Sequence, residues 1–135
     1  MTPEINKKKE NKYDLEDRLI DFAVRIIGVA ESLPNTPVGN HIRGQLIHSG
    51  TSPAPNYGEA QSAESRDDFI HKMKIALKEL RETRVWLKII QRINLAKDNE
   101  EVKKIIIESD ELIPIFFVSI GTAKKNKTSE QRKNG

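Results

Sequence analysis

The longest regular pattern in the chain covers residues 66–96, RDDFIHKMKIALKELRETRVWLKIIQRINLA. Apolar residues recur in it at steps of three and four, the spacing that places side chains on one face of an α-helix. This stripe comprises Phe69, Met73, Ala76, Leu80 and Leu87 and continues to Asn94. Ser65 precedes it, and Ser65 with Asp68 resembles a capping box in which Asp replaces Glu or Gln. The pattern therefore predicts one long helix over residues 66–96.

Two segments precede this helix. Residues 13–33 carry one apolar helical face, made of Leu15, Leu19, Phe22, Ile26, Ala30 and Leu33. The sequence Pro34-Asn35-Thr36-Pro37 ends that pattern. Residues 38–63 are less regular, because they contain Gly50, Pro53, Pro55 and Gly58, which kink or unwind a helix. We expect one kinked helix here or, as the alternative, two shorter helices.

A fourth segment follows the turn at Lys97-Asp98, with Asp98 and Glu101 at its start. Its apolar face comprises Val102, Ile105, Ile106, Leu112, Ile113, Phe116, Phe117 and Ile120. We expect Pro114 to bend this helix. Long helices joined by short turns run antiparallel to their neighbours. The sequence thus predicts an all-α fold, an antiparallel up-and-down four-helix bundle.

The excess positive charge of the chain lies at its two ends. The 135 residues carry a net charge of +3, of which residues 1–12 hold +2 and residues 124–135 hold +4. Residues 13–123 therefore have a net charge of −3. Because the two ends lack apolar residues that would order them, we predict a flexible basic N-terminal tail, a bundle domain over residues 13–123 and a disordered basic C-terminal tail.

Composition also limits the location of the protein. No apolar run is long enough for a membrane span, and the N-terminus has no apolar stretch typical of a secretory signal. There is no cysteine, which excludes disulfides and thiolate metal sites and fits a reducing compartment. We expect a cytoplasmic protein with no membrane partner.

A basic stripe follows one side of the predicted helix 66–96. It consists of Lys74, Lys78, Arg81, Lys88 and Arg92. Such a stripe can bind the phosphates of RNA or DNA without regard to sequence. The alternative is a solvated helix face with ion pairs one turn apart, such as Glu82 with Lys78.

A second apolar stripe lies on another side of the same helix. Its members are Ile75, Trp86, Ile89 and Ile93. The two apolar stripes together exceed the arc that a helix in a monomeric bundle needs to bury. The second stripe therefore predicts an interface with another copy of the chain; the alternative is a broad core stripe that packs against two neighbouring helices.

No catalytic or cofactor motif is found. The sequence lacks a glycine-rich phosphate loop, a nucleophile elbow and the Glu-x-x-His pattern of di-iron bundles. His41 and His48 are seven residues apart, but no carboxylate pair stands at metal-ligand spacing with them. We expect no enzymatic activity, no metal and no cofactor.

Residues 45–60, QLIHSGTSPAPNYGEA, together with SRDDFI at 65–70, IALKELRET at 75–83 and Trp86-Leu87, form a distinctive pattern. It resembles the bacterial four-helix bundle proteins of the 23S rRNA intervening-sequence family, over about residues 13–124. The resemblance implies a bundle that assembles into a ring, commonly a homopentamer, without catalytic activity. Related bundles are accessory proteins of diversity-generating retroelements, in which the ring binds nucleic acid and a reverse transcriptase. Self-association, RNA or DNA, and a reverse transcriptase are therefore the partners that the resemblance implies.

Asn56 and Glu59 match the most characteristic pair of residues in that family. His48 departs from the pattern, because an arginine is usual there, and Pro53 and Pro55 replace residues that normally continue the helix. We favour a structural role for the pair: Asn56 satisfies backbone groups freed by the kink, and Glu59 pairs with a basic residue such as Arg43 or Arg81.

Two functional hypotheses remain. The first is a non-enzymatic oligomeric scaffold or accessory factor that binds RNA or another nucleic acid through the basic stripe and the tails. The alternative is a protein–protein interaction module with no nucleic-acid role, which the net charge of −3 on residues 13–123 favours.

Overall fold

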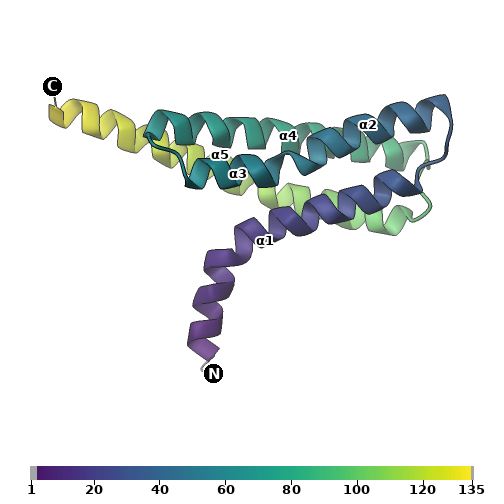
Figure 1. Cartoon of the computed structure of the whole chain (residues 1–135), viewed down its shortest axis with the longest axis horizontal. Coiled ribbons are helices and arrows are strands. Elements are labelled where there is room, and N and C mark those ends of the chain that lie inside the picture. Colours follow the sequence, from purple (N-terminus) through teal and green to yellow (C-terminus); the bar gives the residue numbers. More distant parts are fainter. Residues whose placement is uncertain (1–2, 135) are drawn as a thin grey trace.

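The computed structural model describes the backbone of residues 3–134 and the side chains of residues 15–132. This part of the chain contains helices and no strands. The helices are α1 (Pro3–Ser32), α2 (Pro37–Thr51), α3 (Pro53–Gln61), α4 (Arg66–Arg92) and α5 (Asn99–Asn134). Only Ser52 separates α2 from α3, and the two form one bent rod beside α1, α4 and α5 (Figure 1). The predicted antiparallel four-helix bundle is confirmed.

Side chains cap the helices at the positions where the sequence places helix starts. Thr36 accepts a hydrogen bond from the backbone N–H of Gly39 (3.0 Å), and Pro37 occupies the first turn of α2, where its missing N–H costs nothing. Ser65 caps α4 through the N–H of Asp68 (3.1 Å). At α5, Asp98 accepts from the N–H of Glu101 (3.1 Å). These bonds satisfy backbone donors that have no partner within the helix.

The C-terminal end of α4 corrects one prediction. Asn94, predicted in the core stripe, is exposed and has a φ of 53°, the left-handed region that asparagine tolerates better than most residues. The N–H of Leu95 donates to the carbonyl of Ile90 (3.1 Å) and that of Asn94 to the carbonyl of Gln91 (3.2 Å). This is a Schellman motif, so Asn94 ends the helix instead of packing in its core.

The break between α2 and α3 confirms the alternative of two shorter helices. Pro53 and Pro55 have no backbone N–H, so two hydrogen bonds of a continuous helix cannot form. The side-chain amide of Asn56 donates to the carbonyl (3.0 Å) and to the hydroxyl (2.9 Å) of Ser52. The Asn56 side chain thus bonds to the one residue that separates the two helices.

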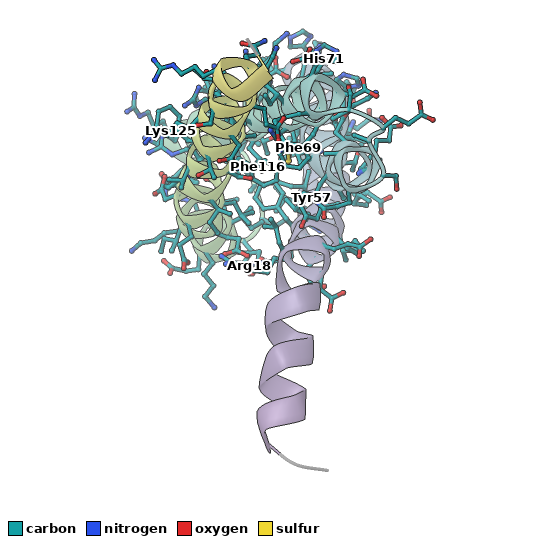
Figure 2. All side chains as sticks on the ribbon, turned by 90° about the vertical axis from the view of Figure 1, so that its left-hand side faces the viewer. Arg18, Tyr57, Phe69, His71, Phe116 and Lys125 are labelled. Carbon is teal, nitrogen blue, oxygen red and sulfur yellow. The ribbon has the colours of Figure 1, made fainter. Side chains whose placement is uncertain are left out.

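The core lies between the four rods. Its largest fully buried side chains include Phe22 and Phe116, and the ring of Tyr57 contacts Phe116 edge-on at a centroid distance of 6.0 Å. Figure 2 shows Phe69, Tyr57 and Phe116 pointing into this interior, whereas Lys125 points outward. Burial raises the pKa of Tyr57, with a smaller contribution from Glu16.

One aromatic residue departs from the predicted core. Phe117 was expected on the apolar face of the last helix, yet 62% of it is exposed. Its neighbour Phe116 is fully buried, and consecutive residues of a helix point about 100° apart, so the two rings cannot share one face.

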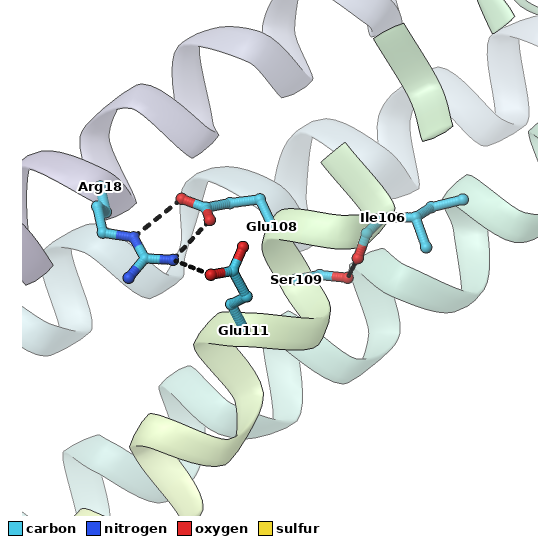
Figure 3. Close-up of polar contacts among 5 residues, drawn as sticks. All are labelled: Arg18, Ile106, Glu108, Ser109 and Glu111. Atoms are coloured by element: carbon cyan, nitrogen blue, oxygen red, sulfur yellow. Dashed lines mark hydrogen bonds and ion pairs between the residues drawn. The ribbon is translucent and has the colours of Figure 1, made fainter. Parts of the chain in front are cut away.

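Ion pairs connect α1 to α5. Arg18 donates to both carboxylate oxygens of Glu108 (2.6 and 3.1 Å) and lies 3.8 Å from Glu111 (Figure 3). Arg25 bonds Glu101 at 2.6 Å, nearer the C-terminal end of α1. Because later residues of α1 meet earlier residues of α5, these pairs fix the antiparallel register of the two helices.

Both ends of the described chain continue a helix. The N-terminal part of α1 turns away from the bundle, and α5 extends past the connection between α3 and α4 (Figure 1). Lys127 pairs with Asp67 and Glu130 pairs with Arg66, which connects the end of α5 to the start of α4. Residues 1–2 and 135 lie outside the described residues. The division of the chain into a bundle and two flexible tails stays a prediction.

Among the described residues, no helix is both long enough and apolar enough to cross a membrane.

Candidate nucleic-acid interface

The predicted basic stripe lies on the side of α4 that adjoins α5. Lys74, Lys78 and Arg81 line a groove between the two helices with a volume of about 430 Å³. Lys124 of α5 completes its rim, whereas Lys88 and Arg92 continue the stripe along α4 beyond the groove. The structure therefore brings three of the five predicted residues together and adds a fourth cation from α5.

The rest of the groove lining has no charged side chain. It consists of Leu77 of α4 and of Phe117, Ile120 and Gly121 of α5. None of the lining residues is acidic, so four positive charges surround a small apolar surface. A groove of this composition suits an anionic ligand that also has a flat or apolar part.

Like charges face each other across this groove. Repulsion by the ammonium group of Lys74 lowers the pKa of Lys124 below its usual value of 10.5. An anion bound between the two ammonium groups would offset that repulsion and favour the charged form of Lys124.

The basic residues of this surface differ from the other cations of α4 in their partners. Within the described side chains, none of Lys74, Lys78, Arg81, Lys88, Arg92 and Lys124 forms an ion pair with a carboxylate. The pair of Glu82 with Lys78, expected if the stripe were an internally neutralised face, is not formed there. Other cations of α4 are paired: Lys72 with Glu59 (2.7 Å), Arg84 with Asp110, and Arg66 with Glu130. The unpaired charges of the helix are therefore concentrated on the side of the groove.

Sequence reasoning missed two members of the groove. Lys124 was placed in the C-terminal tail and Phe117 in the core. In an antiparallel pair, late residues of α5 lie beside early residues of α4. This rule could have placed Lys124 near Lys74. The register of the pair depends on ion pairs such as Arg84 with Asp110, which the spacing of apolar residues does not show.

The residues of the second apolar stripe, which predicts a subunit interface, differ in their exposure. Ile75 and Trp86 are half-buried, and the Trp86 ring contacts His41 of α2 edge-on at 6.0 Å. Ile89 and Ile93 are 36% and 51% exposed. Packing against a neighbouring helix thus accounts for Trp86, while an interface with another copy stays a prediction for the exposed end of the stripe.

Further large apolar residues are exposed on α1, α2, α4 and α5. They are Ile20, Val24 and Ile27 of α1, Val38 of α2, Val85 of α4, and Ile107, Ile115 and Val118 of α5. The three residues of α1 are spaced by four and three, so they share one face of that helix. This face offers a second apolar surface for contact with a protein.

The Asn56/Glu59 motif makes contacts within the chain. Glu59 pairs with Lys72, not with Arg43 or Arg81 as predicted, and its hydrogen bond raises the pKa of Lys72. Arg43 instead donates to the carbonyls of Ala30 (3.0 Å) and Leu33 (2.6 Å) at the end of α1. Arg43 therefore caps α1, whose last carbonyls lack partners within the helix.

In the part of the chain that the structure describes, no group of three or more His, Asp or Glu residues is arranged to hold a metal ion.

Comparison with known proteins relates the chain to one family. Residues 11–116 match a family model described as 23S rRNA-intervening sequence protein. The chain is also similar to a crystal structure from Bacteroides thetaiotaomicron VPI-5482, described as a protein with unknown function from the S23 ribosomal protein family. The two are 36% identical with a TM-score of 0.71, over 78% of this chain and 97% of that one. A comparison with curated proteins gave no match.

Proposed function

Since the chain belongs to the 23S rRNA-intervening sequence protein family, we propose that it is a non-enzymatic, oligomeric helical-bundle protein of the cytoplasm that binds RNA through the basic side of α4 and α5. One observation carries the proposal. Among the described side chains, six cations lie along this side with no carboxylate partner, although other cations of α4 are paired.

The geometry of the stripe suits a nucleic-acid backbone. From Lys74 to Arg92 the cations follow α4 for about 27 Å, at a rise of about 1.5 Å per residue. Phosphates bind lysine and arginine by charge, with no requirement for sequence, and binding releases condensed counterions. A linear series of unpaired cations therefore supports binding to a polyanion more than binding to a single small anion.

A salt titration tests this function. Binding of a fluorescently labelled RNA is measured by anisotropy at several salt concentrations, for the wild type and for a variant with Lys74, Lys78, Arg81, Lys88 and Arg92 changed to Glu. We expect the logarithm of the affinity to fall linearly with the logarithm of the salt concentration, and the variant to lose binding. Binding that is independent of salt, or unchanged in the variant, contradicts the proposal.

The C-terminal end of α5 needs its own control. Lys125 and Arg132 are exposed cations outside the groove, so a variant with both changed to Gln measures what this end contributes. If this variant loses all binding while the five-residue variant retains it, the contact lies on the extension of α5 and not on α4.

A protein–protein interaction module is the second candidate. The exposed apolar face of α1, with Ile20, Val24 and Ile27, favours it, as does the net charge of −3 on residues 13–123. A protein such as a reverse transcriptase is the partner that the family resemblance implies. Association through this face would persist at high salt and would be lost on Val24→Asp, which separates it from binding through the basic stripe.

Self-association is part of the proposal, with a homopentameric ring as its expected form. The half-buried Trp86 is a poor position for a test, since an acidic residue there would also disturb contacts within the bundle. Ile93 is exposed at the end of α4, so Ile93→Asp changes the surface alone. Light scattering of the wild type should give an oligomer and that of Ile93→Asp a smaller species; a monomeric wild type contradicts the ring.

A further inference from the structure

Phe117 lies in an unusual environment. It is 62% exposed, although a phenylalanine in a bundle usually contributes to the core, and it lines the groove between α4 and α5. Across the groove, α4 contributes Lys78 and Arg81, and one and two turns further along α5 lie Gly121 and Lys124. The exposed ring is therefore a flat apolar surface among cations.

Gly121 keeps the space beside this ring open. A methyl group added at Gly121 would meet no atom within 4 Å outside its own helix backbone. The groove is thus open on the α5 side, and its volume of about 430 Å³ lies within the range of small-molecule sites, about 300–1,000 Å³. An aromatic ring with free space beside it can accept another ring on its face.

The surrounding charge selects what can occupy that space. A neutral apolar ligand or an apolar helix face of another protein would leave the cations of the rim partly desolvated without partners, which is unfavourable. A nucleotide offers a flat base for the aromatic ring and phosphates for the cations. Cationic grooves with exposed aromatic rings bind single-stranded nucleic acids in this way, because every base has a face that can stack.

We propose that the α4–α5 groove binds single-stranded RNA, with one unpaired base stacked on Phe117 and the adjacent phosphates held by Lys74, Lys78, Arg81 and Lys124. This inference rests on the proposed function and adds the substrate class, an unpaired segment. Bases in a duplex already stack on one another, so their faces are not available to the ring of Phe117. The groove therefore discriminates between an unpaired segment and a duplex.

The test compares a 12-nucleotide single-stranded RNA carrying one 2-aminopurine with a duplex of the same length. Fluorescence of 2-aminopurine reports stacking, and anisotropy reports affinity. For the wild type we expect tighter binding of the single strand and a change of 2-aminopurine fluorescence on binding. Phe117→Ala should weaken single-strand binding by about 5- to 100-fold, the effect of one lost stacking contact, and leave duplex binding unchanged.

Three further variants make the result specific. Phe117→Tyr retains an aromatic face and should bind the single strand like the wild type. Gly121→Leu fills the space beside the ring and should lose the fluorescence change. Val118→Ala is the matched control, because Val118 is 63% exposed on the same helix but does not line the groove, and it should change nothing.

Each outcome is informative. If single strand and duplex bind equally, or if Phe117→Ala binds like the wild type, base stacking on Phe117 is wrong while RNA binding by the basic stripe stands. If neither RNA binds at all, both the inference and the proposed function are wrong. If Phe117→Ala and Val118→Ala weaken binding equally, the effect is not specific to the groove and the inference is overturned.

Discussion

Lys72 and Lys74 are two residues apart on α4 and have opposite surroundings. Lys72 forms an ion pair with Glu59 of α3 at 2.7 Å, and that hydrogen bond raises its pKa. Lys74 faces Lys124 of α5, and the repulsion between them lowers the pKa of Lys124. The side of α4 that faces α3 thus pairs its lysine with a carboxylate, whereas the cations on the groove side have no carboxylate partner among the described side chains.

This difference separates residues that support the fold from residues available to a ligand. Exposed ion pairs contribute little to stability, typically below about 1 kcal/mol, so the paired side gains little from its arrangement. The unpaired side is mildly unfavourable for folding, because like charges are held close together. A surface that opposes folding and yet forms an open groove is better explained by binding than by stability.

Removal of charge from the groove side or from the paired side of α4 tests this difference directly. A groove variant, with Lys74, Lys78 and Lys124 changed to Gln, is matched by a paired-side variant with Arg66, Lys72 and Arg84 changed to Gln. Both lose three charges, so a nonspecific effect of net charge is the same in each. We expect the groove variant to bind single-stranded RNA at least about 100-fold more weakly at low salt, with a salt slope lower by about 2.

The paired-side variant should stay within about twofold of the wild type, since its cations already have carboxylate partners. Isothermal titration calorimetry or anisotropy measures both affinities, and circular dichroism confirms that both variants are folded. Equal losses in the two variants would show that RNA responds only to net charge, and the distinction between the two sides would then have no functional meaning.

Gly50 and Gly121 differ in the space around them. A methyl group at Gly50 would lie 2.5 Å from the side chain of Ile26, because α2 and α1 approach closely there, whereas one at Gly121 would meet open space. Gly50→Ala should therefore lower the free energy of unfolding by about 1–3 kcal/mol. Gly121→Ala should raise it by about 0.5–1 kcal/mol, since alanine is the better helix former.

Urea denaturation of the two variants measures this difference. It shows whether the α4–α5 groove is as open in solution as the space beside Gly121 indicates. A destabilised Gly121→Ala would mean that the groove is closed, and an unpaired base would then have no room beside Phe117.

Much of the fold could be predicted from the sequence. Apolar spacing identified the four helical segments, and Ser65 and Asp98 cap α4 and α5 where the sequence predicts these helices to begin. Local chemistry is sufficient there, since a cap or a proline acts on its own segment.

The site could be predicted only in part. Five cations with helical spacing identified the basic side of α4. Lys124 and Phe117 lie in the groove because of the register of α5 against α4, and no local sequence pattern predicts that register. The two neighbours Phe116 and Phe117 are equally apolar in sequence, and only the packing of the whole bundle makes one of them buried and the other exposed.

Lys72 and Lys124 should have small effects on how stability depends on pH. The pKa of Lys72 is raised, so its favourable contribution to stability is complete below the usual value of 10.5 and is lost as the pH rises through the folded-state pKa. The pKa of Lys124 is lowered, so its unfavourable contribution is present at neutral pH. This contribution is removed as the pH rises from the folded-state pKa to 10.5. The free energy of unfolding should therefore rise through Lys124 as the pH approaches 10.5 from below, and fall through Lys72 as the pH rises above 10.5.

NMR titration of the lysine side chains resolves the two effects. Glu59→Gln should lower the pKa of Lys72, because it removes the carboxylate, and Lys74→Gln should raise the pKa of Lys124 towards 10.5, because it removes the repelling ammonium. Addition of single-stranded RNA should raise the pKa of Lys124 and leave that of Lys72 unchanged, since a phosphate in the groove is close to only one of them. A shift of both lysines by RNA would place the ligand on the α3 side as well, and no change at Lys124 would exclude a phosphate from the space between Lys74 and Lys124.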